Sequence, residues 1–165
     1  MADHVEFVLE QWARERPELD VSPMGVIGRL QRLCRLLDGE LQRVFGTHQL
    51  DRPAFDVLAT LRRSGPPHSL TPAELMRASM VTSGAITQRL DRLEGRGLIA
   101  RTRSQADGRS IHVTLTPEGK ALIDRALPDH VTNESRLLGA LTRGEQEALA
   151  GHLRTLLESL GDTRP

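Results

Sequence analysis

The stretch TPAELMRASMVTSGAITQRLDRLEGRGLIA, residues 71–100, predicts two helices separated by a short turn. The first helix begins after Thr71, which has capping-box spacing to Glu74 and is followed by proline at the first helical position. The second helix ends at Gly95 and Gly97. Its apolar side chains recur at steps of four and three residues: Ile86, Leu90 and Leu93. Two helices around such a turn predict a helix-turn-helix.

A β-hairpin is expected directly after this helix pair. Apolar and polar residues alternate over 98–103 and 110–115, and the loop between these segments contains Asp107-Gly108. Another helix begins at Thr116-Pro117, and Pro128 is expected to kink it or end it early. A hairpin behind a recognition helix is a wing. The predicted fold class is therefore mainly α (α+β), a winged helix-turn-helix.

Amphipathic helices flank this middle section on both sides. The first is expected from Asp3 to about Arg16, a long second one from Ser22 to about Gly46, and the last from about Thr142. We expect one domain over 1–165, with the winged helix-turn-helix at about 51–116. The helices at about 3–47 and 117–161 are candidates for a dimerisation region.

Charge is unevenly distributed along the chain. The whole chain has 22 basic and 22 acidic residues, whereas the section from Arg62 to Arg109 carries a local charge of +5. Lys120 is the single lysine, and arginine suits bidentate contacts to phosphate and guanine. Arginine-rich codon usage explains that bias equally well. Aromatic residues make up 2% of the chain, too few for single-strand stacking platforms, so duplex DNA is the favoured partner.

Several classes of protein are disfavoured by the sequence. No apolar run of 18 residues is present, so we expect no membrane segment and a cytoplasmic location. The scattered histidines and the absence of nucleophile motifs argue against an enzyme, and no metal or cofactor is expected. Cys34 is the single cysteine. It cannot form an internal disulfide, and on the apolar stripe of the long helix we expect it to be buried and inert.

Three segments resemble the MarR family of winged-helix regulators: LEGRGLI at 93–99, DGRS at 107–110 and LTPEG at 115–119. The resemblance implies a homodimer with intertwined terminal helices. Its recognition helices would enter successive major grooves about 34–36 Å apart, on a near-palindromic operator. Trp12 in an extended first helix, with the spacing of Asp56, Arg63 and Arg89, is similar to the urate-responsive, PecS-like branch of that family.

Candidate DNA contacts lie on the recognition helix and at the wing tip. Residues in the first turns reach base edges, whereas those further along suit phosphates. We expect base contacts from Thr82, Ser83, Thr87 and Gln88, and phosphate contacts from Arg92 and Arg96. Arg109 is expected to enter the minor groove. The alternatives are a solvated helix face, a helix-capping role for Thr82 and a salt bridge between Arg109 and Asp107.

A second set of residues predicts a ligand site. Asp56 and Arg63 are seven residues apart and so lie nearly in line on one helix face. Arg63 is expected to bind a planar anion and Asp56 to accept its ring N–H, with Trp12 as an apolar wall or, alternatively, as plain packing. Arg89 points about 100° away from Gln88, which turns it from the DNA-reading side and would couple the ligand to the recognition helix.

The predicted function is a ligand-responsive transcriptional regulator, a repressor released from its operator by a small anion such as urate. Two alternatives stay open. The first is a redox-sensing regulator that acts through Cys34. The second is an architectural DNA binder without a ligand.

Overall fold

The computed structural model describes residues 2–80, 86–103 and 110–163, which form two compact units. The first unit extends to Glu40. It contains α1 (His4–Glu15) and most of α2 (Ser22–Thr47). Asp3 caps α1 by accepting a 2.9 Å hydrogen bond from the backbone N–H of Glu6, and it also forms a 2.7 Å ion pair with Arg29 of α2. One carboxylate therefore caps the start of α1 and ties this helix to α2.

The expected burial of Cys34 is wrong, because this side chain is exposed. The neighbouring apolar residues Leu33 and Leu36 are also 47% and 68% exposed. This part of the apolar stripe of α2 is thus uncovered by the described residues.

The second unit begins at Leu41 and holds the remaining elements. They are α3 (Arg52–Arg63), β1 (Ser69–Leu70), α4 (Pro72–Ala78), α5 (Ile86–Gly95), β2 (Ile99–Arg103), β3 (Ile111–Leu115), α6 (Pro117–Leu137) and α7 (Arg143–Ser159). Helices dominate, and the three strands form one antiparallel sheet in the order β1-β3-β2. The predicted mainly α fold class is confirmed. Strand β1 was not anticipated, since two residues are too few to show an alternating pattern.

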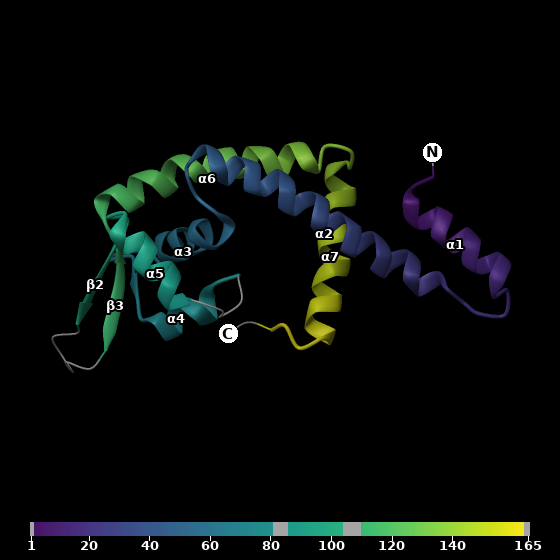
Figure 1. Ribbon diagram of the computed structural model, residues 1–165, viewed down its shortest axis with the longest axis horizontal. Coiled ribbons are helices and arrows are strands. Elements are labelled where there is room, and N and C mark those ends of the chain that lie inside the picture. The colour runs from purple at the N-terminus through teal and green to yellow at the C-terminus, as the bar shows by residue number, and fades with distance from the viewer. Residues whose placement is uncertain (1, 81–85, 104–109, 164–165) are drawn as a thin grey trace. The chain divides into compact units, whose positions relative to one another are not determined.

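Helix α5 leads directly into the hairpin of β2 and β3 (Figure 1). The helix ends at Gly95, and Gly97 in the turn that follows has a φ of 68°, a backbone conformation that glycine adopts without strain. The backbone N–H of Leu98 then donates a 3.0 Å bond to the carbonyl of Leu93, which satisfies a helix-terminal acceptor. Ile99 pairs with Leu115 and Arg103 with Ile111, so the hairpin register starts beside the end of α5.

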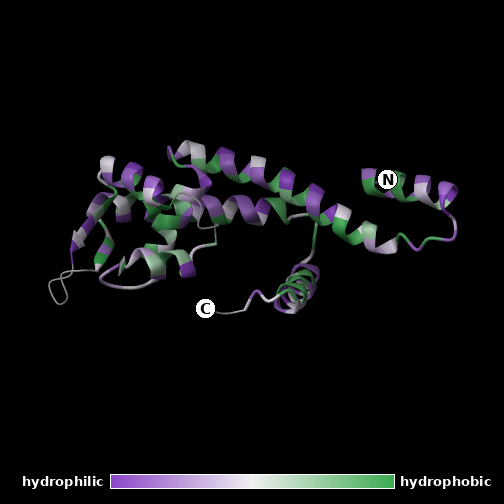
Figure 2. Cartoon of the chain, turned by 60° about the horizontal axis from the view of Figure 1, so that its bottom comes forward, coloured by the Kyte–Doolittle hydropathy of each residue, from purple (hydrophilic) through white to green (hydrophobic). Residues whose placement is uncertain are grey.

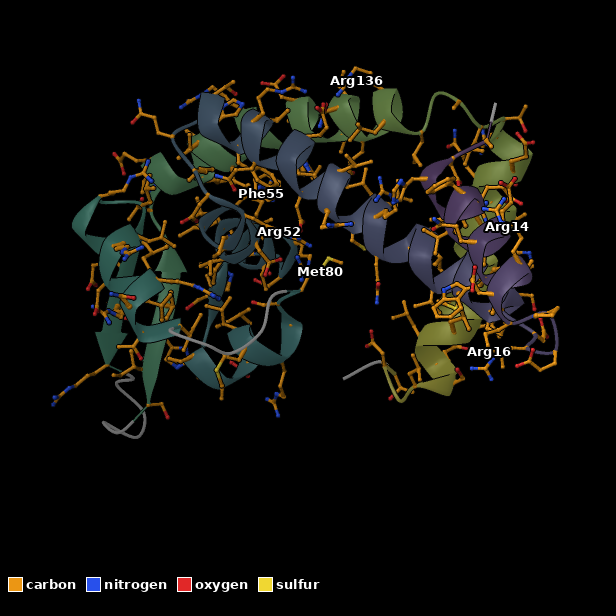
Figure 3. All side chains as sticks on the ribbon, turned by 45° about the vertical axis from the view of Figure 1, so that its right-hand side comes forward. Arg14, Arg16, Arg52, Phe55, Met80 and Arg136 are labelled. Atoms are coloured by element: carbon orange, nitrogen blue, oxygen red, sulfur yellow. The ribbon has the colours of Figure 1, made fainter. Side chains whose placement is uncertain are left out.

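One hydrophobic core holds α3, α5, the sheet and α6 together. Val57, Leu58 and Leu61 line the inner face of α3 and are fully buried. The ring of Phe55, labelled in Figure 3, stacks on that of Phe45 with centroids 4.5 Å apart. These contacts fix the helix-turn-helix and the wing relative to α3.

The first turn of α6 approaches the backbone that precedes β2. A Cβ added at Gly119 would lie 1.9 Å from the carbonyl oxygen of Leu98, so no other residue fits without a backbone shift. Thr116 caps the helix through the backbone N–H of Gly119, at 3.0 Å. The hydroxyl of Thr116 also donates to the carbonyl of Gly97, at 2.7 Å. The start of α6, the start of the wing and the end of α5 therefore meet at this point.

Pro128 was expected to kink the helix or to end it early. The early end is wrong, because α6 continues past this proline to Leu137. Ala126 before the proline and Asn133 after it are both buried. Packing on both sides of Pro128 stabilises a continuous helix despite the missing hydrogen-bond donor.

Helix α7 begins with a complete capping box between Thr142 and Glu145, but none of its residues is buried. Figure 2 shows both hydrophilic and hydrophobic residues on this helix. Its exposed leucines include Leu156 and Leu157, at 44% and 50%. The described chain therefore leaves the apolar stripe of α7 uncovered.

Candidate DNA interface and ligand site

The described part of α5 has one buried and one exposed side. Leu90 and Leu93 face the core, whereas Thr87, Gln88 and Arg92 are exposed. The three predicted DNA contacts thus share the solvent side of this helix. The predicted contacts Thr82, Ser83 and Arg109 lie outside the described residues.

Arg96, a predicted phosphate contact, already binds protein. Its Nη1 donates a 2.8 Å hydrogen bond to the carbonyl of Gln49, in the turn before α3. Gln49 has a φ of 55°, a left-handed conformation that is uncommon for a residue with a side chain. Arg96 therefore fastens the end of α5 to that turn.

Asp56 and Arg63 both bind backbone at the C-terminal end of α4, at Met80 just beyond the helix and at Ala78, its last residue. The backbone N–H of Met80 donates a 3.0 Å hydrogen bond to Oδ2 of Asp56. Nη2 of Arg63 donates to the carbonyl of Ala78. Met80 is labelled in Figure 3, and it is the last described residue before α5. One face of α3 thus binds a backbone N–H and a backbone carbonyl of the segment ahead of the recognition helix.

The burial of these two charged residues differs. Asp56 is 8% exposed, and a buried carboxylate is stable only when its oxygens accept hydrogen bonds. Arg63 is exposed and its guanidinium has further N–H donors. The seven-residue spacing is therefore bridged by the protein's own backbone, while Arg63 stays accessible from solvent.

The two other predicted ligand contacts lie on different elements. Arg89 on α5 is half-buried, whereas its neighbour Gln88 is exposed, in keeping with the 100° turn between them. Trp12 lies on α1 in the first unit and is 39% exposed.

Sequence reasoning missed an ion-pair cluster between the wing and α5. Nη2 of Arg101 on β2 lies 2.7 Å from Asp91 and 2.5 Å from Glu94. The guanidinium holds the pKa of the Glu94 carboxyl below its usual value. The spacing of Asp91 and Glu94, three residues apart on a helix, is a signal that marks a shared partner.

The parts of the chain that the structure describes contain neither a candidate metal site nor a candidate membrane span. No group of three histidine, cysteine or acidic side chains there is placed to hold a metal ion. Among the helices described, none has the length and apolar character needed to cross a membrane.

Known proteins share this arrangement. The family model described as "MarR family" matches residues 48–110. The regulator PecS of Dickeya dadantii is 43% identical over 159 residues, which cover 95% of this chain and 93% of PecS. The transcriptional repressor NicR of Pseudomonas putida is 32% identical over 145 residues, 86% of this chain and 90% of NicR.

Solved structures agree with the sequence relatives. BpsR of Bordetella bronchiseptica, whose DNA binding is regulated by 6-hydroxynicotinic acid, superposes with a TM-score of 0.71 at 27% identity, covering 79% of this chain and 91% of BpsR. Sco3205 of Streptomyces coelicolor, solved in complex with DNA, gives 0.76 at 24% identity, covering 87% and 90%.

The helix pair, the hairpin that follows it and the exposed side of α5 define a winged helix-turn-helix protein. The chain belongs to the MarR family of transcriptional regulators, a class of DNA-binding proteins and not of enzymes. Within that family it is similar to PecS, as the spacing of Asp56, Arg63 and Arg89 predicts.

Proposed function

We propose that this protein is a homodimeric repressor that leaves a near-palindromic operator when a small planar anion such as urate binds at Arg63 and Asp56. The observation that carries the proposal is the contact of both side chains with the backbone at Ala78 and Met80, where the chain leaves α4 ahead of the recognition helix. An anion at these residues competes with contacts that hold the turn.

The chemistry of the two side chains fits such a ligand. Arg63 presents a planar fork that binds carboxylates and other planar anions bidentately. Asp56 accepts a hydrogen bond from a ring N–H as it does from the backbone N–H of Met80. Regulation of the relative BpsR by 6-hydroxynicotinic acid, a nitrogen heterocycle that is also an acid, supports the same ligand class here.

Binding of ligand and DNA is then reciprocal. A ligand that favours a displaced turn weakens DNA binding by the factor by which DNA weakens the ligand, with a coupling of roughly 1–3 kcal/mol. Arg89, half-buried on α5, is proposed as the second route from ligand to recognition helix. Trp12 stays a predicted ligand contact.

Dimerisation is proposed from the uncovered apolar side chains of the terminal helices. Ile27 and Leu36 on α2, Val131 on α6 and Leu157 on α7 are each at least 50% exposed. A second copy of the chain would cover such stripes, and two recognition helices would then read two half-sites about 34–36 Å apart. We propose 51–116 as the DNA-binding region and the terminal helices as the dimerisation region of a single domain.

The test is operator release by urate and by other small anions at constant ionic strength, with parent protein and Arg63→Ala compared. Release of the parent alone supports the proposal, whereas absence of release with every anion favours an architectural DNA binder. Because Cys34 is exposed, the same assay is also run with peroxide to test the redox alternative. Peroxide release that Cys34→Ser abolishes, without any effect of anions, would establish that alternative instead.

A further inference from the structure

The side of α5 that carries the predicted DNA contacts also carries acidic charge. Asp91 has an exposed side chain and follows Gln88 by three residues, so the two lie on one face of the helix. Glu94 follows three residues later and is 36% exposed. Carboxylates here would repel the phosphates of a bound duplex. Something has to offset their charge if this face approaches DNA.

Arg101 offsets that charge from the wing. Its Nη2 contacts Oδ1 of Asp91 at 2.7 Å and Oε2 of Glu94 at 2.5 Å, while its Nε donates to Oε2 of Glu94 at 2.9 Å. The backbone N–H of Arg101 donates to the other oxygen of Glu94, also at 2.9 Å. Main chain and side chain of one residue therefore hold both oxygens of Glu94.

The burial of the cluster fits an internal role for this arginine. The side chain of Arg101 is 28% exposed, less than that of either carboxylate. Arg103, two residues on and on the same face of β2, is exposed. The strand thus turns one arginine onto α5 and leaves the next open to solvent.

We infer that Arg101 is a positioning residue for DNA recognition, because it holds the wing on α5 and neutralises Asp91 and Glu94 so that this face can meet phosphates. The inference rests on the DNA binding of the proposed function. Arg101 acts through the two carboxylates and does not itself contact the duplex.

The experiment compares operator affinity, salt dependence and thermal melting for four proteins. They are the parent, Arg101→Gln, Arg101→Lys, and Arg101→Gln combined with Asp91→Asn and Glu94→Gln. We expect Arg101→Gln to weaken binding about tenfold at 0.15 M salt, because two surface carboxylates lose their partner. The triple variant and Arg101→Lys should bind within about threefold of the parent, since neither leaves uncompensated negative charge.

Arg103→Gln is the matched control, because it removes an exposed arginine from the same strand face. If Arg103 binds phosphate, its loss lowers the salt slope by about 0.9, and the Asp91→Asn and Glu94→Gln changes do not rescue it. The same behaviour in Arg101→Gln would overturn the inference, as would unchanged affinity. Melting temperatures show which variants are folded, and the triple variant decides the matter if Arg101→Gln is not: binding close to that of the parent supports the inference, and weakened binding overturns it. A parent protein that binds no duplex would overturn the proposed function itself, a failure visible before any variant is compared.

Discussion

The backbone N–H of Met80 donates a 3.0 Å hydrogen bond to Oδ2 of Asp56, which joins α3 to the turn ahead of the recognition helix. Asp56 is 8% exposed and Met80 is 84% exposed, so the bond is shielded from water on the side of the carboxylate only. A ligand that takes the place of Met80 at Oδ2 would release this part of the turn.

Replacement of Asp56 by alanine should weaken both folding and operator binding. The Met80 N–H loses its hydrogen bond to Asp56, at a cost of about 0.5–1.5 kcal/mol, because Met80 is 84% exposed and water can take the place of the carboxylate. Asp56→Asn keeps an acceptor oxygen without the charge, so it should retain operator affinity better than Asp56→Ala. Chemical denaturation and operator titration measure the two effects. Equal affinity of both variants with the parent would show that the Met80 contact does not position α5.

Replacement of Arg63 by alanine should raise the urate concentration needed for operator release by at least about tenfold, because a hydrogen bond to a charged group contributes about 1.5–3 kcal/mol. Arg62→Ala is the control, since Arg62 pairs with Asp124 of α6 at 2.7 Å instead of contacting the turn. A competition assay at fixed salt makes the measurement. An equal loss of response in both variants would place the anion elsewhere.

Gln88 and Arg92 should differ in what their loss does to DNA binding. Gln88→Ala should relax the base preference at one operator position, at a cost of about 1–3 kcal/mol. Arg92→Ala should weaken binding to all sequences alike and reduce the salt slope by about 0.9. Titrations of operator variants at several salt concentrations separate the two. A sequence-independent loss in Gln88→Ala would remove it from the base-reading set.

Gly119→Ala should destabilise the protein by about 2 kcal/mol or more, because the new methyl group meets the carbonyl of Leu98 and forces a shift in packed backbone. Gly144→Ala is the control in α7, where nothing lies within 4 Å of an added Cβ. That variant should be neutral or slightly stabilised. Thermal melting compares them, and a parent-like Gly119→Ala would show that the start of α6 can move away from the wing.

Leu157→Glu should shift the protein toward monomers and weaken operator binding, because a charge on an apolar interface carries a large desolvation cost. Arg154→Ala, an exposed position of the same helix, serves as the control. Sedimentation velocity gives the oligomeric state. A Leu157→Glu protein with unchanged mass would exclude α7 from the interface.

Local signals predicted most of the fold. Asp51, Thr71 and Thr142 each accept a hydrogen bond from the backbone three residues on, as their positions before apolar periodic segments indicate. Strand β1 and the passage of α6 through Pro128 depend instead on tertiary contacts. The exposure of Cys34 likewise reflects which surfaces the described chain leaves open.

The sequence indicates which residues form the candidate site, but not which atoms they contact. The spacing of Asp56 and Arg63 marks a shared partner, but it does not show that backbone atoms of Ala78 and Met80 take that place. In the sequence, Arg101 is visible only as one of the basic residues of the positively charged section 62–109. Its contact with Asp91 and Glu94 of α5 forms when the hairpin folds back on that helix.

The atoms that Asp56 and Arg63 hold are main-chain atoms, so the link between α3 and the turn does not depend on the side chains at 78 and 80. Substitutions of the side chains at 78 and 80 therefore leave both contacts available. A ligand response that works through Asp56 and Arg63, as proposed, would tolerate changes of sequence at the end of α4.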